Sequence, residues 1–270
     1  MTEILLHAVI LILGFGTGIL IGILGIGGGL IFVPVLYFIL PLFDIPPTQL
    51  VFVTVGTSLF AGAIASTSSG LQHYFKKNVI LREAKILAIG SVLSAFILPF
   101  FITQVNSKVI EIIVVVVLVI IALKMFMERN GDNSTRQSGT VDDKFLLVLG
   151  IIAGSLSAFT GFGGGILYVP VLIYIFSEDI NKAVGTSAVV TALTMISSSA
   201  SFLLQTSKIV STHLHLGYVL LPVGLTLGAG AVIGTFPGVK LALLSPQRNI
   251  KKIFSVMLII AAVRIIFSLW

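Results

Sequence analysis

The chain has 270 residues, of which 57% are hydrophobic and only 10% are charged, and its formal net charge is +6. A soluble domain of this length needs more charge to cover its surface, so the composition indicates that a lipid bilayer is the solvent. Basic residues in a membrane protein are mostly topological signals, so the net charge does not indicate a nucleic-acid partner. The chain has no cysteine, which excludes disulfides, thiolate chemistry and cysteine-based metal sites.

Apolar runs of membrane-spanning length recur along the chain. A spanning helix needs about 20 apolar residues, with about 17 to 25 tolerated. The first run lacks the basic start and the small-residue cleavage site of a signal peptide, so we expect it to remain in the mature protein. Runs that are long enough lie at about 4–24, 49–69, 84–102, 109–127, 183–205, 218–240 and 253–270.

Shorter apolar runs flank two glycine clusters. The first cluster, GIGGGLIFVPVL, covers Gly25 to Leu36, and the second, GFGGGILYVPVL, covers Gly161 to Leu172. Each cluster joins one segment before it to one after it, which predicts either two crossings or one re-entrant hairpin. The short runs lie at about 28–41, 145–160 and 164–176.

The two halves of the chain resemble one another across one long polar stretch, ERNGDNSTRQSGTVDDK, which is typical of a solvated linker. The glycine cluster occurs once in each half, and VGTS at 55–58 recurs at 184–187. We therefore predict an all-α polytopic membrane protein of two repeats, each with about five hydrophobic segments and a broken or re-entrant helix at its glycine cluster. The predicted parts are repeat 1 at 1–127, a cytoplasmic linker at 128–144 and repeat 2 at 145–270.

An odd number of crossings in each half predicts two repeats of inverted topology. With this topology most basic residues fall on one side of the membrane, and the opposite side holds few beyond Lys108, Lys208 and Arg264. Since basic residues concentrate in cytoplasmic loops, this arrangement places both termini outside the cytoplasm. The basic side collects Lys76, Lys77, Arg82, Lys85, Arg129, Arg136, Lys144, Lys182, Lys240, Arg248, Lys251 and Lys252.

Some glycines recur at intervals of four residues, which lets helix backbones approach closely in a membrane. We expect these glycines to pack helices and to have no further role. They are Gly14, Gly18, Gly22, Gly230, Gly234 and Gly238.

The two glycine triplets predict something different, because each glycine costs a helix about 1 kcal/mol relative to alanine. They indicate unwound backbone inside the membrane, which is tolerated only where protein or a wet cavity satisfies its polar groups. The helix after each triplet begins with free amides, and such an N-terminus is an anion site. The alternative is a packing hinge. The predicted amide donors are Gly27, Gly28, Gly29, Gly163, Gly164 and Gly165.

Hydroxyl side chains occupy matched positions in the two GTS elements. They are Thr57, Ser58, Thr186 and Ser187, each inside an apolar run. Such hydroxyls often bond back to their own helix. The alternative is that all four donate to the same central ligand.

Several kinds of site are missing from the sequence. No carboxylate lies well inside an apolar run, which argues against a cation carrier built on a buried acid. The histidines lie near segment ends, and His213 and His215 alone are weak evidence for metal. No nucleotide or zinc-protease motif occurs, and a serine nucleophile lacks a base in a matching apolar helix. We expect no catalytic residues, no metal site and no enzyme activity.

The doubled glycine–proline cluster, the VGTS elements and HYFKKNV at 73–79 resemble the TauE/SafE family of sulfite and organosulfonate exporters. The resemblance covers nearly the whole chain. It implies a bacterial or archaeal plasma-membrane permease that exports small anionic sulfur compounds, such as sulfite or sulfoacetate, without an organic cofactor.

The residues and the resemblance together predict an exporter that works by alternating access, with one repeat rocking against the other. The bilayer and a small sulfur-containing anion are the predicted partners, and a homodimer is left open. The rivals are a passive anion channel of the same fold and a membrane scaffold whose glycines only pack helices. A cation carrier is the third alternative.

Overall fold

The computed structural model describes residues 3–43, 45–101, 119, 123, 142–176, 178–206 and 213–269. The predicted run at 109–127, apart from two single positions, and nearly all of the linker at 128–144 lie outside these residues. The side chain of Arg264 lies outside them as well.

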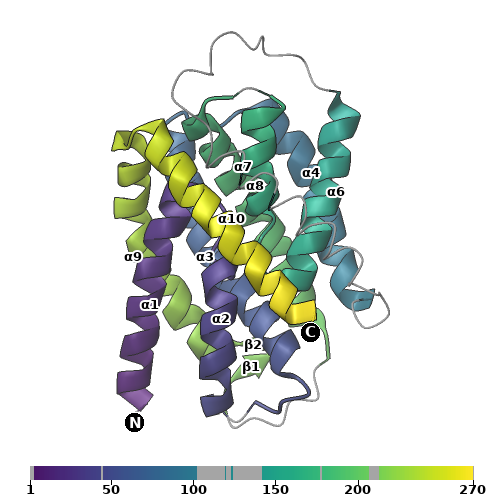
Figure 1. Ribbon diagram of the computed structural model, residues 1–270. Coiled ribbons are helices and arrows are strands. Elements are labelled where there is room, and N and C mark those ends of the chain that lie inside the picture. The colour runs from purple at the N-terminus through teal and green to yellow at the C-terminus, as the bar shows by residue number, and fades with distance from the viewer. Residues whose placement is uncertain are drawn as a thin grey trace.

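The described part of the chain is almost entirely helical (Figure 1). Six of its helices are long and apolar enough to cross a membrane, namely α1, α3, α4 with the turn after it, α6, α8 and α9. Apolar side chains cover much of the outer surface, with Ile4 84% exposed and Phe38 83% exposed, as a lipid-facing surface requires. The elements are α1 (Glu3–Leu24), α2 (Gly29–Ile39), η1 (Leu40–Phe43), α3 (Leu50–Phe75), α4 (Leu81–Ile97), η2 (Leu98–Phe101), α6 (Asp143–Thr160), α7 (Gly165–Tyr174), α8 (Ile180–Leu204), β1 (His215–Leu216), β2 (Val219–Leu220), α9 (Leu221–Leu244) and α10 (Gln247–Leu269).

The glycines spaced by four residues pack α1 directly against α9, as the sequence predicts. A Cβ atom added at Gly18 would lie 2.0 Å from the Ala231 carbonyl oxygen, and one added at Gly234 would lie 2.0 Å from the Phe15 carbonyl oxygen. Helices α4 and α6 pack in the same way, since a Cβ at Gly150 would lie 2.3 Å from the Leu87 carbonyl oxygen. Each of these helix pairs joins one helix from each half of the sequence.

Two hydrophobic cores divide the helices into two bundles. The first core joins α1, α2, α3 and α9, which we call the first bundle, through residues such as Ile10, Phe32, Val53 and Leu227. The second joins α4, α6, α7, α8 and α10, the second bundle, through Leu87, Leu156, Leu172, Val190 and Phe254. It also includes the end of α1, Ile26 and the start of α2 at Leu30. A smaller core, with Leu59 and Met195, lies between α3 and α8 where the bundles meet.

The short helices α2 and α7 occupy opposite halves of the molecule, with α2 in the lower half of Figure 1 and α7 in the upper half. Both chain ends lie toward the lower side of the view. Helices α6, α8 and α10 begin at the upper side, and α9 ends there. Each short helix therefore runs through only part of the layer that the long helices span.

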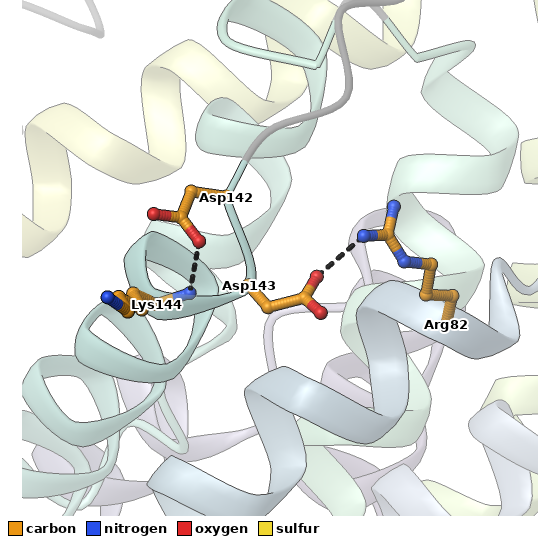
Figure 2. Close-up of polar contacts among 4 residues, drawn as sticks. All are labelled: Arg82, Asp142, Asp143 and Lys144. Atoms are coloured by element: carbon orange, nitrogen blue, oxygen red, sulfur yellow. Dashed lines mark hydrogen bonds and ion pairs between the residues drawn. The ribbon is translucent and has the colours of Figure 1, made fainter.

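Charged residues gather where α4, α6, α8 and α10 begin. Arg82 at the start of α4 pairs with Asp143 at the start of α6, with Nη2 and Oδ1 2.6 Å apart (Figure 2). The Asp142 carboxylate caps α6 by accepting from the Lys144 amide at 3.1 Å, also drawn in Figure 2. Gln247 at the start of α10 donates to Asp179 at the start of α8. Exposed pairs of this kind contribute little to the stability of a fold. They do show that the starts of these helices form a polar end of the molecule.

Replacement of Gly18 by alanine is expected to destabilise the protein, because the added methyl group meets the α9 backbone. Overpacking of this kind costs about 1–3 kcal/mol. Gly16 offers a matched control on the same helix, since a Cβ there meets nothing within 4 Å. Thermal unfolding in detergent should show a lower Tm for Gly18→Ala and an unchanged or slightly higher Tm for Gly16→Ala. Equal Tm values for the two variants would contradict the packing described here.

Candidate anion site at the two helix breaks

The first glycine cluster interrupts a helix inside the protein. Helix α1 ends at Leu24 and α2 begins at Gly29, with non-helical backbone between them. Gly25 and Gly27 have φ values of +64° and +75°, which only glycine adopts without strain. The whole segment is buried. We call it the first break.

The second cluster forms the matching second break between α6, which ends at Thr160, and α7, which begins at Gly165. Gly161, Gly163 and Gly164 have φ values of +76°, +86° and +79°. The two breaks differ in backbone at the residue before each short helix, because Gly28 has a φ of −86°. The helices are thus interrupted at both clusters, as the sequence predicts, and the last glycine of each triplet begins the short helix.

The two breaks lie against each other where the two bundles meet. A Cβ added at Gly29 would lie 1.7 Å from the Gly161 carbonyl oxygen, and one added at Gly165 would lie 2.6 Å from the Ile26 Cα. Any side chain at these positions would push the breaks apart. Glycine is therefore required here by close backbone approach as well as by φ.

Each GTS serine reaches across to the break in the other bundle. Ser187 on α8 donates to the Gly25 carbonyl oxygen at 2.8 Å, and Ser58 on α3 donates to the Gly161 carbonyl oxygen at 3.3 Å. These acceptors lie just past the ends of α1 and α6, where carbonyls lack helical partners. Ser187 also donates to the Gly165 carbonyl oxygen of its own bundle at 3.4 Å. The serines therefore join the two bundles through the breaks.

The GTS threonines brace backbone within each bundle. Thr57 accepts from the Leu220 amide at 3.0 Å, just before α9, and Thr186 accepts from the Ile80 amide at 2.9 Å, just before α4. Both threonine bonds thus reach backbone in the opposite half of the sequence. Their role as donors to a ligand, like that of the serines, stays a prediction.

The amides of the two triplets have no hydrogen-bond acceptor in the described part of the chain. Among the residues that the structure describes, none accepts a hydrogen bond from these amides, and neither Gly28 nor Gly164 supplies a side-chain cap. The N-terminal end of a helix carries about half a positive charge. Helices α2 and α7 therefore both begin with positive ends where the two breaks meet, which we call the junction. The amides belong to Gly27, Gly28, Gly29, Gly163, Gly164 and Gly165.

Two residues of α8 that sequence reasoning missed lie between the breaks. An added Cβ at Gly27 would lie 2.9 Å from the Thr191 Cγ2 and 3.1 Å from the Met195 Sδ, and one at Gly163 would meet the same two atoms within 2.9 Å. Ser66 on α3 donates to the Met195 sulfur at 3.6 Å. The signal that could have found them is their spacing, since they follow Ser187 by one and two helical turns on the same face.

One of the four histidines, near the end of α3, lies inside the protein. His73 near the end of α3 is fully buried, and its Nε2 lies 3.2 Å from the Gly22 carbonyl oxygen. Sequence reasoning placed it only near a segment end, because hydropathy does not show which end residues become covered by a neighbouring helix. Among the described residues, no group of three or more histidine, aspartate or glutamate side chains could hold a metal ion.

Removal of the Ser187 hydroxyl is expected to loosen the contact between the bundles, because the Gly25 carbonyl then loses its donor. A buried hydrogen bond of this kind contributes about 1 kcal/mol. Ser255→Ala is a matched control, since that buried hydroxyl bonds to the Lys252 carbonyl of its own helix. In amide hydrogen exchange, Ser187→Ala should raise exchange in 25–29 and 161–165, whereas Ser255→Ala should not. Identical exchange in the two variants would show that the serine does not hold the breaks together.

Comparison with known proteins agrees with this architecture. The family model described as Sulfite exporter TauE/SafE matches residues 10–265. A probable membrane transporter protein of Haemophilus influenzae is 32% identical over 254 residues, covering 94% of this chain and 95% of that protein. A probable membrane transporter protein of Methanocaldococcus jannaschii is 29% identical, covering 88% of this chain and 87% of that protein. No solved structure matches. The chain therefore belongs to the TauE/SafE sulfite exporter family, and it is a multi-pass membrane transporter and not an enzyme.

Proposed function

We propose that this protein exports sulfite or small organosulfonates, such as sulfoacetate, across the plasma membrane of a bacterium or archaeon. The observation that carries the proposal is the meeting of two buried helix breaks whose triplet amides have no acceptor among the described residues. An oxyanion bound between the breaks accepts hydrogen bonds from those amides and faces two positive helix ends. The sulfur chemistry of the cargo comes from the family alone.

The expected binding strength suits a transporter. At about 4 Å and an effective dielectric near 20, each half-charge stabilises a monoanion by about 2 kcal/mol. Two helix ends then contribute about 4 kcal/mol, which corresponds to roughly millimolar binding. Such a site releases its cargo readily.

The proposed fold consists of two inverted repeats, at 1–127 and 145–270, that interlock. Matched contacts support it: each GTS serine bonds the break of the other half, and each GTS threonine accepts the amide that precedes α9 or α4. The glycine-packed pairs α1–α9 and α6–α4 correspond in the same way. An inverted repeat generates pairs of this kind through its two-fold relation.

The moving bodies are the two packed bundles. Each core contains residues from both halves of the sequence, so the predicted rocking of one repeat against the other would disrupt the packing of both cores. The bundles instead rock about the contact between α3 and α8, where the Ser58 and Ser187 bonds break and re-form. Both breaks are buried in this structure, which supports a transport cycle that includes a state closed to both sides.

The proposed orientation puts the basic end of the molecule in the cytoplasm and both termini outside. Apart from Arg264, whose α10 position lies toward the opposite end, the described lysines and arginines lie at one set of helix ends. They are Lys76, Lys77, Arg82, Lys85, Lys144, Lys182, Lys240, Arg248, Lys251 and Lys252. Such concentration is typical of the cytoplasmic side.

The absence of native cysteine makes this orientation directly testable. A single cysteine at Lys77 or Asp142 should react with a membrane-impermeant maleimide only after cells are permeabilised. A single cysteine at Glu3 or His215 should react in intact cells. The opposite labelling pattern would reverse the proposed orientation.

Flux measurements in proteoliposomes distinguish export by alternating access from the rival functions. Sulfite efflux should saturate with concentration, and sulfite on the opposite side should accelerate it, since return of a loaded carrier is faster than that of an empty one. Flux that follows the gradient without acceleration by external sulfite would indicate a passive channel. No selective flux of any sulfur anion would indicate a scaffold.

Assembly as a homodimer stays a prediction. Light scattering of the purified protein in detergent checks it.

A further inference from the structure

The hydroxyl of Thr191 lies at the junction of the two breaks without a partner. Thr191 is fully buried, and its Oγ1 makes no hydrogen bond within the described residues. An added Cβ at Gly165 would lie 2.6 Å from this oxygen, while the Thr191 methyl group faces Gly27 and Gly163. Buried hydroxyls nearly always find a partner, so one left without a partner beside unbonded amides indicates a ligand.

A second hydroxyl lies on the same side of the junction. Tyr168, on the first turns of α7, is fully buried, and an added Cβ at Gly164 would lie 3.1 Å from its Oη. The hydroxyls of Ser91 and Thr194, which bond each other at 2.9 Å, lie near it. Tyr168 Oη has no partner at hydrogen-bonding geometry in the described part of the chain.

Neither hydroxyl has a counterpart at the first break. Four residues after the matched serines of the GTS elements, α8 has Thr191 where α3 has Gly62. Four residues after the matched glycines Gly28 and Gly164, α2 has Phe32 where α7 has Tyr168. The Phe32 ring covers Gly28, since an added Cβ there would lie 2.2 Å from the ring. The two half-sites therefore differ in chemistry although their backbones are related.

We propose that Thr191 Oγ1 and Tyr168 Oη donate hydrogen bonds to the oxyanion, so that the second break binds it through hydroxyls as well as amides, whereas the first break binds it through amides alone. This inference rests on the proposed function. It adds two substrate-binding residues on one side of the junction. The ligand class is a small oxyanion with at least one oxygen directed toward α7 and α8.

The test compares sulfite binding to the detergent-purified full chain and to four variants by titration calorimetry. Thr191→Val should weaken binding about tenfold, as expected for a lost hydrogen bond to a charged group. Thr191→Ser, which keeps the hydroxyl, should bind within about twofold of the wild type. Tyr168→Phe should weaken binding at least about threefold. Thr54→Val is the matched control, because Thr54 is also fully buried and has no partner among the described residues, but none of its atoms is among those nearest to an added Cβ at any triplet glycine. This variant should bind as the wild type does.

Thermal unfolding without sulfite separates this role from a structural one. Loss of a hydroxyl that has no protein partner should leave the Tm of Thr191→Val equal to or above that of the wild type. Wild-type affinity in Thr191→Val and Tyr168→Phe would overturn the inference while leaving the proposed function standing. Equal weakening in Thr54→Val, or a matching loss of Tm in Thr191→Val, would also overturn it. If the wild type binds no sulfite, sulfonate or thiosulfate, the proposed function fails and this inference fails with it.

Discussion

Unwound backbone inside a membrane must find partners for its amides and carbonyls, and the rest of this structure follows from that constraint. Helices α1 and α6 both end inside the protein, and α2 and α7 begin just after them. Each break therefore has carbonyls without helical partners at the end of the first helix and amides without helical partners at the start of the second. The carbonyls of Gly25 and Gly161 receive serine hydroxyls from the opposite bundle. The triplet amides have no acceptor among the described residues, which makes the junction suited to an anion.

The meeting of the two breaks also accounts for the many glycines that pack helices around the junction. Helices α1 and α9, and likewise α4 and α6, approach at backbone distance, so each bundle contains one closely packed helix pair. The proposed motion occurs at the contact between α3 and α8, where small and hydroxylated residues such as Gly62 and Ser66 face Met195. A flexible thioether at this point adapts to changing surroundings more readily than a branched side chain.

Hydropathy and glycine spacing predict most of the fold. The expected runs coincide with the described helices to within a few residues, and α9 begins later than expected because the β1–β2 hairpin occupies 215–220. The doubled cluster locates both breaks and suggests that they meet. The grouping of helices from different halves into two bundles is not readable in this way, because long-range packing leaves no local pattern. Thr191 and Met195 likewise look like ordinary helical residues until the fold brings them between the breaks.

The central claim is that both breaks hold one oxyanion. Crystals grown with selenite, the selenium analogue of sulfite, allow the anion to be located by anomalous diffraction. The account predicts one selenium peak with its oxygens about 2.7–3.1 Å from amides of both triplets. A peak bound away from the triplets, or no selenium in the membrane region at concentrations that saturate transport, would contradict it.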